Sequence, residues 1–237
     1  MLNVQNIFAG YGRLQILNGV TLDAKPKEVT VIVGPNGSGK STLLKSIAGL
    51  ANIYNGTIKV DGREISGMPS HKIARSGIAY LPQTDNVFTN LTISENLRLA
   101  GYTIEAKSFE TRLARILQLF PQLQAYTKTK ALNLSGGERQ MLAMALALIR
   151  EPNVIMFDEP TANLAPKIAT QVLKIISSLA KEIGLTIVLA EQNAKRALEI
   201  GDAAYLLVGG KNAFTGTARE LLEHKELGRL YLGVLAS

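Results

Sequence analysis

Short runs of apolar residues alternate with amphipathic stretches along this chain of 237 residues. Continuous Val/Ile/Leu runs bounded by turn or charged residues predict buried strands, whereas apolar residues at helical spacing predict helices. The predicted strands are Glu28–Val33, Asn153–Phe157 and Leu185–Ala190, and the predicted helices are Ser41–Leu50, Gly136–Arg150 and Lys167–Glu182. Because strands and helices alternate at this spacing, we expect βαβ units and an α/β fold with a mostly parallel sheet.

The N-terminal part shows a different pattern. Leu2–Phe8, Val20–Asp23 and Gly56–Val60 predict short strands, and Asp61-Gly62 is a strong turn signal. We therefore expect an antiparallel sheet beside the parallel one.

Residues from about Asp85 to Ala131 contain no convincing strand pattern. Leu97–Leu99 and Phe109–Phe120 carry apolar residues at helical spacing, and Pro121 is expected to end the main helix. The prediction is one domain over residues 1–237. Residues 1–84 and 151–237 form its core with the antiparallel part, and residues 85–150 form a helical subdomain.

Composition narrows the class of protein. Hydrophobic residues make up 46% and charged residues 19%, as in folded globular proteins. The net charge of +7 is compatible with a nucleic acid, an anionic membrane surface or a phosphorylated ligand as partner. The absence of cysteine excludes disulfides and Cys-based zinc or thiol chemistry. The longest apolar run, Met141–Ile149, is nine residues, and a bilayer-spanning helix needs ~20.

A glycine-rich segment carries the strongest chemical signal. Gly34-Pro35-Asn36-Gly37-Ser38-Gly39-Lys40-Ser41-Thr42 matches the phosphate-binding pattern G-x-x-x-x-G-K-[ST]. Its N–H groups and the following helix dipole can bind phosphate, Lys40 can reach the β and γ phosphates, and Ser41 can ligate Mg²⁺. The alternative is an ordinary glycine-rich turn, but a predicted strand precedes the segment and a predicted helix follows it.

Two further segments fit a phosphate site. The strand Val154–Phe157 leads into Asp158 and Glu159, and the ends of such strands line the ligand crevice. Asp158 can bind Mg²⁺, and Glu159 can polarise an attacking water as general base. Ser135-Gly136-Gly137-Glu138 fits a capping box at a bare helix start. A bare helix start is an anion site, which suggests a nucleotide shared between two subunits.

Together these segments resemble the ATP-binding cassette (ABC) ATPases over essentially the whole chain. Gly34–Thr42 resembles the Walker A loop of that family, Val154–Glu159 its Walker B strand, and Leu134–Gln140 its LSGGQ signature. The resemblance implies a P-loop NTPase core with a flanking antiparallel β-subdomain and a helical subdomain.

The resemblance also assigns roles to residues that the pattern alone leaves unassigned. It implies that Tyr11 stacks on adenine and that Gln83, after the predicted strand Ile78–Leu81, senses Mg²⁺ and the attacking water. It implies ATP and Mg²⁺ as cofactors, with Ser41, Gln83 and Asp158 at the metal. The catalytic residues would be Glu159, Gln192 and Lys40.

Two positions depart from the usual pattern of the family. Ala165 stands where most members have aspartate, and Gln192 stands where most have histidine. Gln192 can donate a hydrogen bond to a γ-phosphate but cannot become positively charged. Slow hydrolysis, or a site completed differently by a partner, would follow. The histidines, His71 and His224, lie elsewhere and are expected to be surface or structural residues.

Short motifs narrow the resemblance to the LivF-type ATPases of branched-chain amino-acid importers. These motifs are Leu164-Ala165-Pro166, Glu191-Gln192-Asn193-Ala194, Phe120-Pro121-Gln122-Leu123 and Tyr231-Leu232-Gly233. The resemblance implies a homodimer or heterodimer of ATPases on two membrane permease subunits at the cytoplasmic face. An extracytoplasmic binding protein would supply the substrate, and no nucleic acid would be involved.

Other interpretations remain open at this point. The chain can be an ABC ATPase for another substrate, or one that acts outside transport. A DNA-repair or chromosome cassette would need long coiled coils, and no sustained heptad repeat is present. A ribosome-acting protein usually has two cassettes, and this chain has one. Ala165 and Gln192 also suggest a nucleotide-binding scaffold with little hydrolysis, but Glu159 argues against it.

Overall fold

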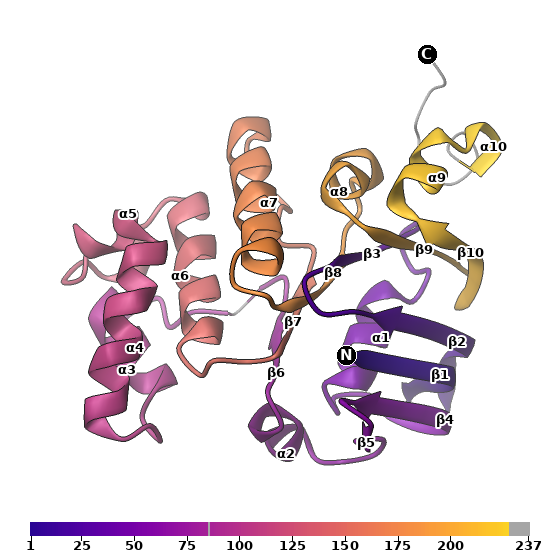
Figure 1. Ribbon diagram of the computed structural model, residues 1–237, viewed down its shortest axis with the longest axis horizontal. Helices are drawn as coiled ribbons and strands as arrows, with labels where there is room; N and C mark the ends of the chain where they lie inside the picture. Colours follow the sequence, from indigo (N-terminus) through magenta and orange to yellow (C-terminus); the bar gives the residue numbers. More distant parts are fainter. Residues whose placement is uncertain (85, 228–237) are drawn as a thin grey trace.

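The computed structural model describes residues 1–84 and 86–227, which form two β-sheets with helices on both faces of the larger one (Figure 1). The Tyr231-Leu232-Gly233 motif lies outside the described residues. The helices are α1 (Lys40–Ile47), α2 (Ser70–Arg75), α3 (Ile93–Ala100), α4 (Ala106–Leu119), α5 (Pro121–Gln124), α6 (Gly136–Leu148), α7 (Pro166–Lys181), α8 (Ala194–Ile200), α9 (Ala218–Glu223) and α10 (Lys225–Leu227), with a short 3-10 helix, η1 (Ala131–Asn133).

The strands confirm the expected mixture of parallel and antiparallel sheets. The strands are β1 (Leu2–Tyr11), β2 (Leu14–Ala24), β3 (Val29–Val33), β4 (Asn52–Val60), β5 (Arg63–Glu64), β6 (Ile78–Leu81), β7 (Val154–Asp158), β8 (Thr186–Ala190), β9 (Ala203–Val208) and β10 (Lys211–Thr217). One sheet has the order β2-β1-β4-β5 and is antiparallel; the other has the order β10-β9-β3-β8-β7-β6.

The six-stranded sheet brings the phosphate-binding elements to one edge. All of its neighbouring strands are parallel except β10, which pairs with β9 in the antiparallel sense. Every residue of β3, β7 and β8 is buried, which explains their continuous apolar sequences. Because β3, β6, β7 and β8 run in the same direction, the segments that follow them emerge together.

Two apolar cores lie on opposite faces of this sheet, because successive strand residues point to opposite sides. In β3, Val31 packs in one core with α7, α8 and α9, and Ile32 packs in the other with α1 and the antiparallel sheet. In Figure 1 these three helices stand on one side of the sheet and α1 on the other. The sheet is therefore a central layer that fixes the loops at its edge.

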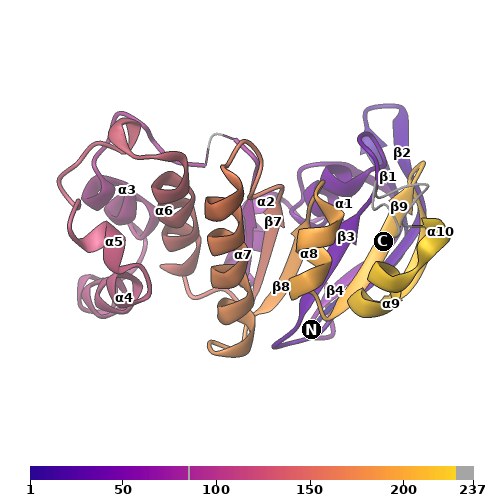
Figure 2. The same ribbon diagram turned by 90° about the horizontal axis from the view of Figure 1, so that it is seen from above.

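The helical region between β6 and β7 also matches the sequence pattern. It contains α3 to α6, and its described residues show only an isolated bridge, Thr92 to Lys130, in place of a strand. Figure 2 shows these helices gathered at one end of the molecule. The helix α4 ends at Leu119, just before Pro121, as expected, and Pro121 is also the first residue of α5.

The sequence pattern missed or shortened several elements. Predicted strand Val20–Asp23 is the end of the longer β2, whose irregular register with β1 obscures the alternation. The predicted helix Ser41–Leu50 ends at Ile47, because Gly49 takes a left-handed conformation with φ 71°. The elements β9, β10, α8 and α9 were not predicted.

Candidate functional site

The loop Gly34–Gly39 connects β3 to α1 at the carboxyl edge of the sheet. Gly34 has φ 148° and Gly39 has φ 102°, conformations that side chains disfavour. A Cβ at Gly34 would lie 2.1 Å from the carbonyl oxygen of Leu207, and one at Gly39 would lie 2.7 Å from Leu17. The glycines are therefore required by both backbone conformation and space.

The N-terminus of α1 has hydrogen-bond donors that an anion could use. Its N-cap, Gly39, provides no side-chain hydrogen bond, and no acidic residue stands in the first turn. The hydroxyl of Ser38 is buried and has no hydrogen-bond partner among the described residues. A phosphate oxygen would accept from this hydroxyl and from the free helix N–H groups. The loop thus fits a phosphate group on the evidence of its own unsatisfied donors.

Lys40 lies folded over the same loop. Its Nζ donates to the carbonyl oxygens of Gly34 at 3.0 Å and Pro35 at 3.2 Å, and lies 3.9 Å from Oε1 of Glu159. Burial lowers the pKa of Lys40, and the nearby carboxylates of Glu159, Asp158 and Glu191 oppose that shift. A bound phosphate would add negative charge and favour the ammonium form.

Ser41 and Asp158 meet at the metal position predicted from the sequence. The Ser41 hydroxyl donates to Oδ1 of Asp158 at 2.8 Å, and Asp158 is buried at the end of β7. Oδ2 of Asp158 accepts from the Tyr80 hydroxyl at 2.9 Å. A hydroxyl and a carboxylate beside a phosphate loop are the oxygen ligands that Mg²⁺ takes together with nucleotide phosphates and water.

Glu159 occupies an unusual backbone conformation directly after β7. Its φ is 49°, in the left-handed region, while its N–H donates to the Ala190 carbonyl at 2.8 Å. Gln83, which leaves the neighbouring strand β6, donates from Nε2 to Oε2 of Glu159 at 3.3 Å. The structure therefore brings the predicted general base, the predicted Gln83 sensor and Lys40 together.

The Ser135–Glu138 segment forms the predicted capping box at the start of α6. The Ser135 hydroxyl accepts from the Glu138 N–H at 3.3 Å, and Oε2 of Glu138 accepts from the Ser135 N–H at 2.8 Å. These bonds lower the pKa of Glu138. Gly137 is needed for packing, because a Cβ there would lie 2.6 Å from Ile168. Ser135 and Gly136 are exposed.

A cavity of about 370 Å³ separates the start of α6 from the acidic edge of the sheet. Gly136 lines it on one side, and Gln83 and Glu159 line it on the other. No residue of Gly34–Thr42 lines this cavity, and no hydrogen bond among the described residues joins Ser135 to that loop. The two predicted anion sites of one chain are thus separate.

Comparison with known proteins agrees with this geometry. Residues 17–162 match the family model described as ABC transporter. A protein of Archaeoglobus fulgidus named "Probable branched-chain amino acid transport ATP-binding protein LivF" is 54% identical, over 99% of this chain and 100% of its own.

The chain belongs to the ABC transporter family.

Two further relatives cover nearly the whole chain. The high-affinity branched-chain amino acid transport ATP-binding protein BraG of Pseudomonas aeruginosa is 38% identical over 98% of this chain and 100% of its own. The ADP conformation of MJ1267, a solved ATP-binding cassette of an ABC transporter, superposes with a TM-score of 0.87 at 27% identity, over 97% of each chain. The chain is accordingly an ABC ATPase that binds nucleotide.

Tyr11 lies at the tip of the antiparallel sheet of this ABC ATPase. It ends β1 and is 41% exposed, so its ring is free to stack. The turn that follows is held by β4, since the Gly12 N–H donates to Asn52 at 3.2 Å and the Tyr54 hydroxyl donates to the Gly12 carbonyl at 3.0 Å. Stacking on adenine stays a prediction.

Gln192 and Ala165, the two positions that depart from the family pattern, differ in their surroundings. Gln192 is exposed and lies two residues beyond the end of β8. Ala165 is the N-cap of α7 and gives it no side-chain hydrogen bond. His71 and His224 are both exposed, and the ring of His224 meets Phe214 edge-on at 6.2 Å.

Glu191 is a residue of this region to which the sequence analysis gave no role in the site. It is 3% exposed, and Oε1 accepts from the N–H of Thr161 at 3.0 Å and its hydroxyl at 2.7 Å. Oε2 accepts from the Gln192 N–H at 3.2 Å. A carboxylate directly after a buried strand, as at Glu159, was the available signal.

Among the helices of the described residues, none has the length and apolar character needed to cross a membrane.

Proposed function

We propose that this ABC ATPase drives the import of branched-chain amino acids. The observation that carries the proposal is the 54% identity to the Archaeoglobus fulgidus protein, which extends over the full length of that relative. Import of other hydrophobic amino acids is the nearest alternative.

The loop and helix start are proposed to hold the triphosphate of ATP. Gly34–Thr42 would bind it through N–H groups and the Ser38 hydroxyl, and Lys40 would leave its carbonyl partners for the β and γ phosphates. Tyr11 would stack on the base. The support is the uncapped start of α1 and the unpartnered Ser38 hydroxyl.

Mg²⁺ is proposed to bind between Ser41 and Asp158, with Gln83 nearby. When bound, the cation would neutralise charge on the β and γ phosphates. Among the described residues, no cluster of three acidic, His or Cys side chains could hold a metal alone, which agrees with a site completed by phosphate oxygens.

Glu159 is proposed as the general base, and Gln192 as a hydrogen-bond donor to the γ-phosphate. The Gln83 amide, 3.3 Å from Oε2, orients the Glu159 carboxylate. Lys40 balances the negative charge from the other side. A water that gives its proton to Glu159 would attack the γ-phosphorus, and the bond from that phosphorus to the β–γ bridging oxygen would break to release ADP and phosphate.

The functional assembly is proposed to contain two cassettes. Because the two anion sites of one chain are separate, the α6 start of one subunit would cover ATP held by the loop of the other. Whether the partner is a second copy or a related ATPase, the pair would sit on two permease subunits at the cytoplasmic face of the membrane. An extracytoplasmic binding protein would deliver the substrate, and the helical region after Gln83 would transmit closure to the permeases.

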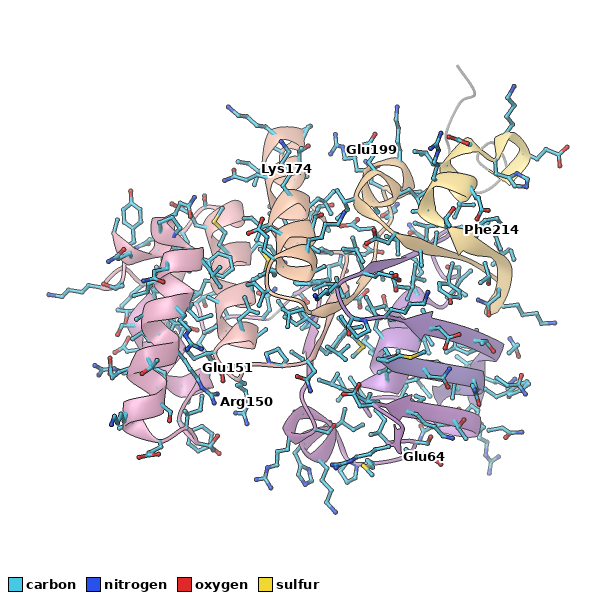
Figure 3. The ribbon with its side chains drawn as sticks, viewed as in Figure 1. Glu64, Arg150, Glu151, Lys174, Glu199 and Phe214 are labelled. Carbon is cyan, nitrogen blue, oxygen red and sulfur yellow. The ribbon has the colours of Figure 1, made fainter. Side chains whose placement is uncertain are left out.

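Uptake of leucine into vesicles that contain the assembled transporter tests this proposal. With ATP inside, we expect uptake and phosphate release from the native complex. We expect Glu159→Gln to lower both at least about a hundredfold while ATP binding persists. Glu199→Gln, at an exposed position on α8 (Figure 3), is the matched control and should change neither.

Failure of the general-base role and failure of the proposed substrate would give different results. Unchanged phosphate release in the Glu159 variant would refute the general-base role. Phosphate release without leucine uptake in the native complex would refute the proposed substrate.

A further inference from the structure

Tyr80 is an additional side chain at the proposed metal site. It lies on the edge strand β6, in register with Met156 of β7, and its hydroxyl reaches across the end of β7 to Asp158 at 2.9 Å. No phosphate-binding motif of the sequence includes Tyr80. Its contact with Asp158 therefore comes from the pairing of β6 with β7.

Asp158 is held by two hydroxyl groups, one at each oxygen. Ser41 donates to Oδ1 and Tyr80 donates to Oδ2. Ser41 would also be a ligand of the cation, so its position depends on the metal as well as on Asp158. Tyr80 holds Oδ2 from outside the metal site and leaves Oδ1 directed toward Ser41. A hydrogen bond to a charged carboxylate is among the stronger ones in proteins.

The ring of Tyr80 is itself held in place. It packs against the core that contains α1 and the antiparallel sheet. With Ala74 and Ile78 it also lines two cavities of about 320 Å³ and 200 Å³ beside α2. The ring is thus bounded by packed atoms on one side and by a surface groove on the other, and the hydroxyl points at Asp158.

We propose that Tyr80 is a positioning residue that holds the Asp158 carboxylate in the orientation needed to bind Mg²⁺. The inference rests on the proposed magnesium role of Ser41 and Asp158, and adds a residue that does not touch the metal.

Tyr80→Phe removes the hydroxyl alone and leaves the ring in the core. The measurement is equilibrium binding of ATP to the purified chain, once with Mg²⁺ and once with EDTA. We expect binding in EDTA to be unchanged, and the gain in affinity on adding Mg²⁺ to fall about threefold to tenfold. Because no turnover is measured, the result reports on the metal site directly.

Tyr205→Phe is the matched control. Its hydroxyl accepts from the Asp23 N–H at 2.9 Å, away from the phosphate loop, so its loss tests removal of a tyrosine hydroxyl in general. This variant should keep the full Mg²⁺ gain. A similar loss in both variants would show a general effect on stability and overturn the proposal.

Ser41→Ala distinguishes a failure of the Tyr80 role from a failure of the proposed metal site. If it abolishes the Mg²⁺ gain while Tyr80→Phe leaves the gain intact, the metal site stands and the role of Tyr80 is refuted. If Ser41→Ala also leaves the gain intact, the proposed metal site itself fails, and the inference about Tyr80 falls with it.

Discussion

At the residue scale, the Glu191 side chain links the segment that follows β7 to the segment that follows β8. Its carboxylate accepts from Thr161, two residues after Glu159, and from the N–H of Gln192. Burying a carboxylate is costly unless such donors compensate. Burial nevertheless raises the pKa of Glu191, although the Thr161 hydrogen bonds oppose the shift. The position therefore costs stability at neutral pH while it holds the segment Glu191–Gln192 next to Thr161.

The raised pKa of Glu191 predicts a pH dependence of stability. Between the ordinary carboxylate pKa and the raised one, the folded chain binds more protons than the unfolded chain, so the free energy of unfolding falls as pH rises. The fall in the free energy of unfolding amounts to about 1.4 kcal/mol for each unit by which the pKa of Glu191 is raised. Glu191→Gln has no carboxylate at this position, so the fall should disappear. Urea unfolding from pH 4.5 to 8 measures it, and Glu64→Gln, at an exposed β5 residue (Figure 3), should keep the native slope. Parallel pH profiles for Glu191→Gln and the native chain would contradict this account.

At the element scale, the start of α6 is a predicted anion site at which the chain's own Glu138 carboxylate already lies. The Glu138 carboxylate accepts the Ser135 hydroxyl and N–H hydrogen bonds, so it lies at the positive end of the helix. If a partner's γ-phosphate binds at this helix start, the carboxylate competes with it for the same donors and repels it. Equivalent boxes cap α3 and α9, where the sequence shows no glycine pair and no phosphate is proposed.

Replacing this carboxylate should favour the closed pair. In a Glu159→Gln background that retains ATP, we expect Glu138→Gln to lower the ATP concentration for half-maximal dimerisation about twofold to fivefold. Sedimentation velocity measures the change. Glu220→Gln, in the same kind of box on α9, should have no effect. An equal response in both variants would indicate altered helix capping and no contact with the partner's nucleotide.

The sequence predicted some elements of the fold and missed others. Strands β3, β7 and β8 were found because they are buried on both faces and read as continuous apolar runs. The hairpin of β9 and β10 was missed although Gly209-Gly210, both with positive φ, is a recognisable two-residue turn.

The residue types of the site followed from motifs, but the Tyr80–Asp158 contact did not. It spans 78 positions and depends on the pairing of two parallel strands, which local patterns do not encode.

At the scale of the whole molecule, the helical region and the nucleotide-binding part share one core. Ile116 of α4 and Ile187 of β8 belong to the same apolar cluster, which runs from α3 and α4 through α6 and α7 to the sheet. Arg112 of α4 also pairs with Glu151, at 3.0 Å, on the segment between α6 and β7, which Figure 3 shows near the lower end of α6. The helices α3 to α6 therefore share an apolar core with the rest of the chain, and the division at residues 85–150 stays a prediction.

A shared core predicts a single cooperative unfolding transition. Ile116→Val and Ile187→Val each remove one buried methyl group and should each cost about 1 kcal/mol. Because one cluster contains both residues, each variant should lower the Tm of the same calorimetric transition by roughly 2–4 °C. Separate transitions, with Ile116→Val shifting one and Ile187→Val the other, would show that the helical region unfolds by itself. A shared transition means that any partner stabilising the helical region also stabilises the phosphate loop, since both belong to one cooperative unit.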